Sequence, residues 1–230
     1  MFNGNATVTG LFEHQLNEYK SVQVTRLVMD FYESDPGRGF YGGGALDGRT
    51  GIGPLGFALF GLPGDAPQWG PEFKSMVSDY FTRTMDVFCH GTSLPMETNS
   101  ISMDHSQTDS LGRPGIRVTY QDHPDDLAMV RWLQERAVEL LDAAGAKKTW
   151  HLPAPVQTVG FHLLGTARMG DDPGTSVVDR YHRSHDVPNL FICDGSSMVS
   201  STRGQPTMTI QALAFRAAEH IAGFAQRNEV

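Results

Sequence analysis

Apolar residues that recur at three- and four-residue steps predict two long helices. One follows Pro124, where Asp125 and Asp126 suit a helix start, and Gly145 suits its end. The other is expected over residues 209–225. A third, less regular stripe predicts a helix over residues 72–88. The apolar stripe of the first helix consists of Leu127, Val130, Leu133, Ala137 and Leu141.

Alternating and β-branched residues predict strands elsewhere. Residues 1–30 contain β-favouring runs separated by polar turns, and residues 101–120 have the pattern of a hairpin. Short strands are expected at 156–161 and 190–193. Residues 35–70 are rich in Gly and Pro and are expected to form long loops. Helices and short strands in this order predict a mixed fold of the α/β (α+β) class.

Composition limits the classes of partner and compartment. With 40% hydrophobic and 19% charged residues, the chain has the composition of a globular protein. The net charge of −8, with no basic run, argues against nucleic acid as a partner. No apolar run approaches the roughly 20 residues that span a bilayer. Cys89 and Cys193 are far apart and form no CxxC pair, so a reducing, cytoplasmic location is expected.

Several short motifs suggest other chemistry. Two stretches match GxGxxG, at residues 37–42 and 51–56, but neither leads into a clear helix, and we interpret both as loops. His182, His185 and Asp186 could contribute to a metal site only with a further ligand from elsewhere, so no metal is expected. Ser196 and His162 could belong to a hydrolase triad, but Ser196 lacks a Gly-x-Ser-x-Gly elbow.

The C-terminal third contains a fixed order of motifs. His162-Leu-Leu-Gly-Thr166 comes first, an apolar run ending in Asp194-Gly-Ser196 follows, and Gln205-Pro-Thr-Met-Thr209 then opens a helix. This order, from about residue 161 to residue 221, resembles the C-terminal segment of the glucose-methanol-choline (GMC) family of flavin oxidoreductases. The resemblance implies oxidation of an alcohol group, with a sugar, glycoside or polyol as the expected substrate and FAD as the cofactor.

The resemblance also implies roles for individual residues. His162 corresponds to the family's catalytic base, and a neutral imidazole is a competent base near neutral pH. Gln205 occupies the position of the partner residue, which is usually asparagine or histidine, and its amide can hold a hydroxyl group but cannot act as a base. Arg203 and Gly204 are alternative candidates for the substrate contact.

The same resemblance assigns the cofactor contacts to two segments. Asp194, Gly195 and Ser196 are expected along the diphosphate and ribityl chain of FAD. Pro206, Thr207 and Thr209 open the helix whose positive N-terminal end is expected to point toward the flavin ring. The structural alternative is an ordinary capped amphipathic helix.

The FAD fingerprint that opens such enzymes is absent from this chain. The resemblance therefore implies a C-terminal half, with residues 1–155 as the substrate-binding domain (plus a short piece of the FAD domain) and residues 156–230 as the C-terminal part of a Rossmann-like FAD domain. A second chain that supplies the N-terminal FAD-binding part is the expected partner, since uncovered apolar faces would otherwise remain. The alternative is a non-catalytic binding or assembly subunit that retains half of a flavoenzyme fold.

Overall fold

The computed structural model describes residues 4–49, 51–151 and 162–227. Within these ranges the chain forms two compact units, which are described separately. The sheet unit comprises the residues from 4 to 91 and from 125 to 151, and the motif unit comprises those from 92 to 124 and from 162 to 227. None of the described helices is long and apolar enough to cross a bilayer.

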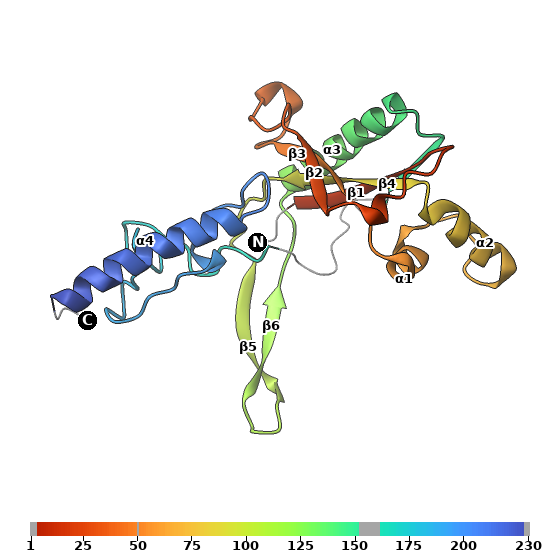
Figure 1. Ribbon diagram of the computed structural model, residues 1–230. Helices are drawn as coiled ribbons and strands as arrows, with labels where there is room; N and C mark the ends of the chain where they lie inside the picture. The colour runs from red at the N-terminus through yellow and green to blue at the C-terminus, as the bar shows by residue number, and fades with distance from the viewer. Residues whose placement is uncertain (1–3, 50, 152–161, 228–230) are drawn as a thin grey trace. The chain divides into compact units, whose positions relative to one another are not determined.

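The sheet unit is built on five antiparallel strands in the order β2-β3-β4-β1-β7 (Figure 1). The strands are β1 (Gly4–Leu11), β2 (Val24–Val28), β3 (Gly44–Arg49), β4 (Thr84–Gly91) and β7 (Lys148–His151). Short helical turns occupy Glu18–Lys20 and Pro36–Arg38, while α1 (Pro54–Gly56), a π-helical turn at Phe57–Gly61 and α2 (Gly70–Phe81) lie between β3 and β4.

The hydrophobic core lies between one face of this sheet and α3 (Pro124–Ala143). The sheet contributes Val8, Leu46 and Val87, and α3 contributes Met129 and Leu133, all at most 1% exposed. Because successive residues of a strand point to opposite faces, every second residue of β1, β3 and β4 enters this core. Gly44 is needed here, since a Cβ at this position would lie 2.3 Å from the carbonyl oxygen of His90.

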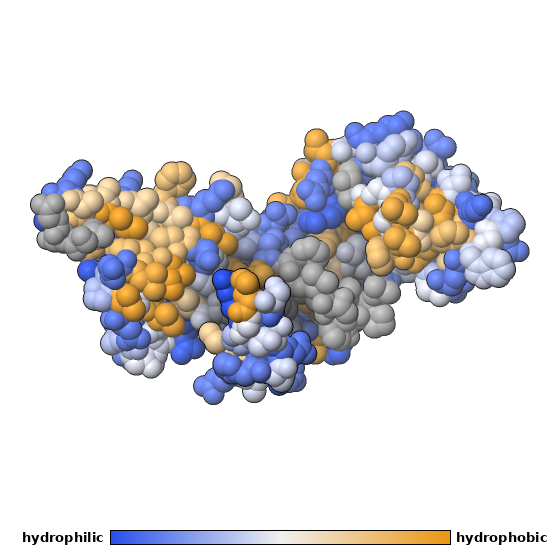
Figure 2. Space-filling view, turned by 90° about the horizontal axis from the view of Figure 1, so that it is seen from below, coloured by the Kyte–Doolittle hydropathy of each residue, from blue (hydrophilic) through white to orange (hydrophobic). Residues whose placement is uncertain are grey.

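The motif unit has little core of its own. Its hairpin pairs β5 (Ser100–Thr108) with β6 (Pro114–Thr119), and it ends in α4 (Thr207–Gln226), with a 3₁₀ turn at Gly195–Ser197 between them. Only Leu164, Val178 and Ala217 are buried hydrophobic residues of this unit among those described. Apolar surface gathers over α4, at the left of Figure 2, where Met208 is 76% and Phe215 75% exposed.

The mixed fold class, the hairpin and the two long helices are confirmed. α3 starts at Pro124 and is followed by Gly145 in a left-handed conformation (φ 94°), as its sequence signals predict. The two β-favouring runs near the N-terminus form β1 and β2.

Three local predictions were wrong. Residues 35–70 contain β3 and three short helical segments in addition to loops. The helix expected over 72–88 ends at Phe81, because β4 begins at Thr84 and pairs with both β1 and β3. Residues 190–193 form no strand, and only Phe191 pairs, as an isolated bridge to Arg183. The strand expected at 156–161 lies outside the described residues.

The second GxGxxG match has more local structure than predicted, but not the structure of a dinucleotide site. β3 precedes it, and α1 and the π-helical turn follow it. However, β3 and the next strand, β4, are antiparallel, whereas the dinucleotide fingerprint belongs to a parallel βαβ unit.

The division at residues 155 and 156 into a substrate-binding and a cofactor-binding domain stays a prediction. The two compact units follow a different criterion, backbone contacts, and place the hairpin segment 92–124 with the C-terminal motifs.

Candidate active site

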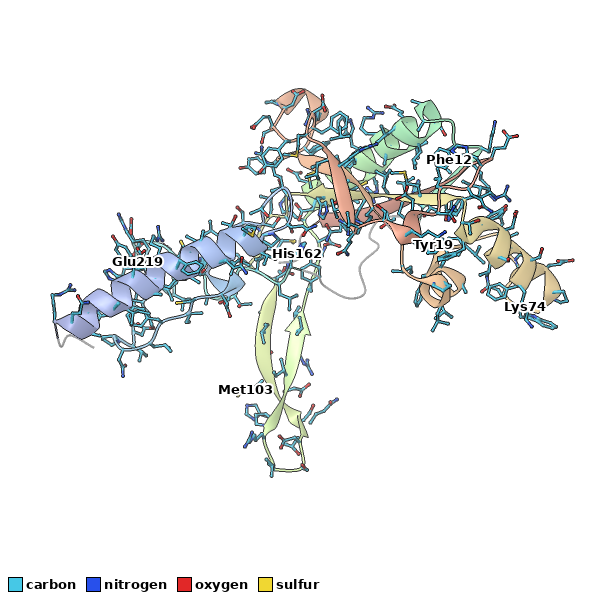
Figure 3. All side chains as sticks on the ribbon, in the orientation of Figure 1. Phe12, Tyr19, Lys74, Met103, His162 and Glu219 are labelled. Atoms are coloured by element: carbon cyan, nitrogen blue, oxygen red, sulfur yellow. The ribbon has the colours of Figure 1, made fainter. Side chains whose placement is uncertain are left out.

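His162 stands at the start of the C-terminal motif segment in a strained backbone conformation. Its φ of 56° lies in the left-handed region, which a non-glycine residue enters at a cost of about 1–3 kcal/mol. Gly165, three residues later, is also left-handed at 89°. The side chain is half-buried, and Figure 3 shows it near the N-terminal end of α4. Such strain persists where the surrounding structure fixes the backbone, as it does here.

The chain after His162 runs beside the Asp194-Gly195-Ser196 turn. Three backbone N–H groups of the first segment donate to three successive carbonyl oxygens of the second. The pairs are Gly165 N to Gly195 O (3.2 Å), Ala167 N to Ser196 O (2.8 Å) and Met169 N to Ser197 O (2.8 Å). Two of the three predicted motifs are therefore held side by side, although about 30 residues separate them in the sequence.

The third motif meets the other two at Gly195. A Cβ at this position would lie 2.8 Å from the carbonyl oxygen of Leu163, 2.9 Å from Leu164 Cδ2 and 3.1 Å from Ile210 Cδ1. Leu163 and Leu164 directly follow His162, while Ile210 belongs to the first turn of α4. Only glycine allows these three segments to come so close, so Gly195 is the point on which the site is assembled.

Asp194 shapes the turn and remains ionised. Its Oδ1 accepts hydrogen bonds from the backbone N–H and the hydroxyl of Ser196, at 2.8 and 2.5 Å. These bonds, together with the nearby His182, hold the pKa of the Asp194 carboxyl below its usual value. The residue is exposed, so the turn presents a carboxylate at the surface of the motif unit.

The start of α4 is left uncapped. Pro206 is the N-cap residue and is buried, and it provides no side-chain hydrogen bond that caps the first turn. Thr207 and Thr209 are exposed in that turn, and Gln205 is exposed just before it. The first N–H groups of a helix carry partial positive charge, so this end of α4 suits a ligand atom with negative charge.

The loop before Gln205 is tied to the segment that precedes the hairpin. Ser201 N donates to Ser93 O at 3.1 Å, and Ser93 N donates to Ser201 Oγ at 2.5 Å. Sequence reasoning missed this anchor and the role of the Leu163 carbonyl, because small polar residues and backbone atoms leave no recognisable pattern.

The two histidines of the 182–186 segment serve the local structure. His182 is 1% exposed, and its Nδ1 lies 2.7 Å from the carbonyl oxygen of Ile192. His185 Nε2 lies 3.0 Å from Ser176 Oγ and 3.1 Å from Gly170 O. Among the described residues, no group of three potential metal ligands comes together.

Comparison with known proteins supports the family assignment. Residues 95–214 match the family model described as GMC oxidoreductase. The chain is 36% identical over 193 residues to the 2-methyl-1,2-propanediol dehydrogenase of Mycolicibacterium austroafricanum, an alignment that covers 84% of this chain and 35% of that protein. It is 30% identical over 168 residues to the gluconate 2-dehydrogenase flavoprotein of Pantoea cypripedii, which covers 69% of this chain and 27% of that protein.

Two further similarities are to a protein named as a subunit and to a solved crystal structure. The fructose dehydrogenase large subunit of Gluconobacter japonicus is 31% identical over 137 residues, 60% of this chain and 25% of that protein. The crystal structure of pyridoxine 4-oxidase from Mesorbium loti aligns with 96% of this chain and 43% of its own, with a TM-score of 0.57 and 15% identity, a likeness of fold alone. The chain thus spans only about a third or less of the length of these curated relatives.

Proposed function

Because this chain belongs to the GMC oxidoreductase family, we propose that it forms the C-terminal part of an FAD-dependent enzyme that oxidises a CH–OH group of a sugar, glycoside or polyol. The observation that carries the proposal is the convergence at Gly195 of the His162 loop, the Asp194 turn and the first turn of α4. The names of the relatives, a diol dehydrogenase, a gluconate dehydrogenase and a fructose dehydrogenase, support this substrate class.

The residues at this convergence fit FAD in two respects. The uncapped N–H groups at Thr207 and Thr209 suit a group that becomes negative when it accepts electrons. The exposed Asp194 carboxylate suits hydroxyl groups, which donate to it, rather than a diphosphate, which it repels. Within the cofactor, Asp194 would therefore hold the hydroxylated ribityl chain, with Gly195 allowing close approach of the backbone and Ser196 keeping the turn closed.

His162 is proposed to accept the hydroxyl proton of the substrate. When bound, FAD would supply the acceptor for the hydride that leaves the same carbon. A neutral imidazole has an ordinary pKa of about 6.5 and can take up a proton near neutral pH. Its fixed, left-handed backbone limits the positions that the ring can reach, which favours one orientation toward a bound hydroxyl group.

Gln205 is proposed to position the hydroxyl group. It is exposed between the Ser93–Ser201 anchor and α4, so its backbone is held while its amide remains accessible. The amide can donate to the substrate oxygen or accept from its hydroxyl group, but it carries no exchangeable charge near neutral pH. His162 is then the base of the pair.

A second polypeptide is proposed to complete the cofactor site. The motif unit exposes large apolar side chains on both α4 and the hairpin, among them Phe215, Met103 and Ile116, each at least 71% exposed. Large apolar side chains exposed in such number are characteristic of a protein interface. Two of the relatives are named as a flavoprotein and a large subunit, which accords with an assembly of several chains.

The test uses the chain together with the protein that co-purifies with it, loaded with FAD. Under anaerobic conditions, a reactive polyol should bleach the flavin absorbance, and His162→Ala should slow that bleaching at least about 100-fold, since general base catalysis contributes about that much. The bound flavin content should stay unchanged. His105→Ala, at an exposed position on β5, is the matched control. Undiminished bleaching in His162→Ala would show that another residue is the base.

A further inference from the structure

The sheet unit has a second face, opposite α3, that is polar and yet buried. On β4 this face carries Asp86, Phe88 and His90. Each is paired in register with one residue of β1 and one of β3, and residues directly opposite on antiparallel strands share a face. We call these nine residues the polar face. They are Asn5, Thr7, Thr9, Ala45, Asp47, Arg49, Asp86, Phe88 and His90.

The polar face does not serve stability in the way a core does. Asp47 is 1% exposed, His90 2% and Asn5 7%. Burial of charged and polar groups is costly, and replacement by apolar residues of similar volume is often neutral or stabilising. The opposite face of the same strands is an ordinary apolar core, so the sequence is able to supply apolar residues at alternate positions.

Arg49 is held on this face from three sides. Its Nε and Nη2 donate to the two carboxylate oxygens of Asp47, each at 2.6 Å, and Nη2 also lies 3.0 Å from His90 Nε2. The guanidinium carbon lies 4.0 Å from the centre of the Phe88 ring. Within the described residues, Nη1 has no hydrogen-bond partner. The Arg49 side chain as a whole is 17% exposed.

Two further residues on the polar face have side-chain atoms without a hydrogen-bond partner among the described residues. Both side-chain atoms of Asn5, the amide nitrogen and the oxygen, are buried without a hydrogen bond among the described residues. Each such atom costs about 1–3 kcal/mol unless something else satisfies it. Asp86 accepts from Thr9 Oγ1 through Oδ1, at 2.7 Å, and no described residue donates to its Oδ2. Donors and acceptors are thus left over on one face.

The charges point to a neutral ligand. Asp47 already balances Arg49 through two hydrogen bonds, and Asp86 lies opposite Arg49 in the register. Arg49 and His90 Nε2 both contact the Asp47 carboxylate, the latter at 2.5 Å, whereas no described residue donates to Asp86 Oδ2, so an anionic ligand would meet the Asp86 carboxyl group and be repelled. A hydroxyl group both donates and accepts, and a compound with several hydroxyls could satisfy Arg49, Asn5 and Asp86 together.

We propose that the polar face is a binding surface for a neutral polyhydroxylated compound, with Arg49 Nη1 and the Asn5 carboxamide as its hydrogen-bonding groups. Asp47, His90 and Phe88 are positioning residues that hold the guanidinium. Binding of this compound does not depend on the proposed function; only its identification as the substrate of the enzyme rests on that function.

The test is an NMR titration of the full flavin-free chain that follows the Arg49 Nε–H and Asn5 amide signals. The probes are D-sorbitol, which is neutral, and D-gluconate, which adds a carboxylate to a similar skeleton. Sorbitol should shift both signals saturably, and gluconate should bind at least about tenfold more weakly, a difference of about 1.4 kcal/mol. Absence of a saturable shift with sorbitol, or equal binding of the two probes, would overturn the proposal.

Variants separate ligand contact from folding. Arg49→Lys keeps the charge beside Asp47 but loses the fixed fork, and Asn5→Leu removes both unpaired atoms at similar volume. Each should weaken sorbitol binding at least about tenfold, and Asn5→Leu should keep or raise the melting temperature of the free chain. Arg26→Met, at an exposed position on β2, should change neither. If Arg49→Lys fails to fold, the test rests on Asn5→Leu alone. Unchanged sorbitol binding in Asn5→Leu would refute the proposed binding surface.

Failure of this binding proposal can be told apart from failure of the proposed function. His162→Ala lies in the other unit and should bind sorbitol as the unmodified chain does, while it loses flavin bleaching. A normal titration with no bleaching in any preparation would contradict only the proposed oxidation.

Discussion

Substitution of Gly195 by alanine is the sharpest single perturbation of the candidate site. The new Cβ would lie 2.8 Å from the Leu163 carbonyl oxygen and 2.9 Å from Leu164 Cδ2, so either the His162 loop or the turn must shift. The closest atom belongs to the backbone and cannot rotate away. Overpacking of this kind typically costs about 1–3 kcal/mol.

That cost should appear locally, in the hydrogen bonds that join the two segments. The amides of Gly165, Ala167 and Met169 donate across the gap that the new methyl group would widen. At about 1.4 kcal/mol per factor of ten, their hydrogen exchange should accelerate by about 5- to 150-fold. Exchange of the β1 and β4 amides, in the sheet unit, should stay unchanged.

The matched control is Gly64→Ala. A Cβ at Gly64 meets nothing within 4 Å, and the residue has no left-handed backbone. This variant should be neutral or stabilised by up to about 1 kcal/mol, because alanine restricts the unfolded chain. Equal exchange of the three amides in Gly195→Ala and in the unmodified chain would refute the view that Gly195 assembles the site.

Two further predictions concern the sheet unit. Burial raises the pKa of Asp86, although the Thr9 hydroxyl and the charge of Arg49 oppose this rise. The stabilisation that the protonated Asp86 carboxyl group contributes is therefore complete below the unfolded pKa of about 3.9, and it is lost as the pH rises through the higher folded pKa. Asp86→Asn should therefore raise the melting temperature at pH 7 and leave it nearly unchanged at low pH. Asp104→Asn is the control and should show no such gain, because hydrogen bonds from Ser106 and Arg117 lower the pKa of the Asp104 carboxyl group. An equal gain for Asp86→Asn at both pH values would count against this reasoning. Leu133→Ala, at a fully buried α3 position, should lower the free energy of unfolding in urea by about 2–5 kcal/mol. Leu140→Ala, at 40% exposure on the same helix, should lower it much less. Equal losses would show that the core lies elsewhere.

The long helices and the hairpin could be predicted because local signals suffice for them. The α3 stripe, its proline start and its following glycine all lie within about 20 residues, and each agrees with the others. The order of the C-terminal motifs was equally visible, since each motif is a short run of unusual residues. What the sequence could not show is that the Asp194 turn pairs with the chain after His162, because that pairing depends on long-range contacts.

The strands β3 and β4 were mispredicted for a related reason. Gly44 and Gly48 give β3 the composition of a loop, yet the close contact of Gly44 with His90 requires glycine in that strand. β4 alternates polar and apolar residues because one face meets α3 and the other carries Asp86 and His90. The residues of the polar face come from three strands, so only their register brings them together.

The visible absorption spectrum of the chain, purified from its native host with any associated protein, tests the proposed oxidation most directly. We predict a bound flavin spectrum that bleaches anaerobically on addition of a neutral sugar or polyol. A colourless chain that has no partner and does not take up added FAD would contradict the proposed function and would favour a binding or assembly subunit.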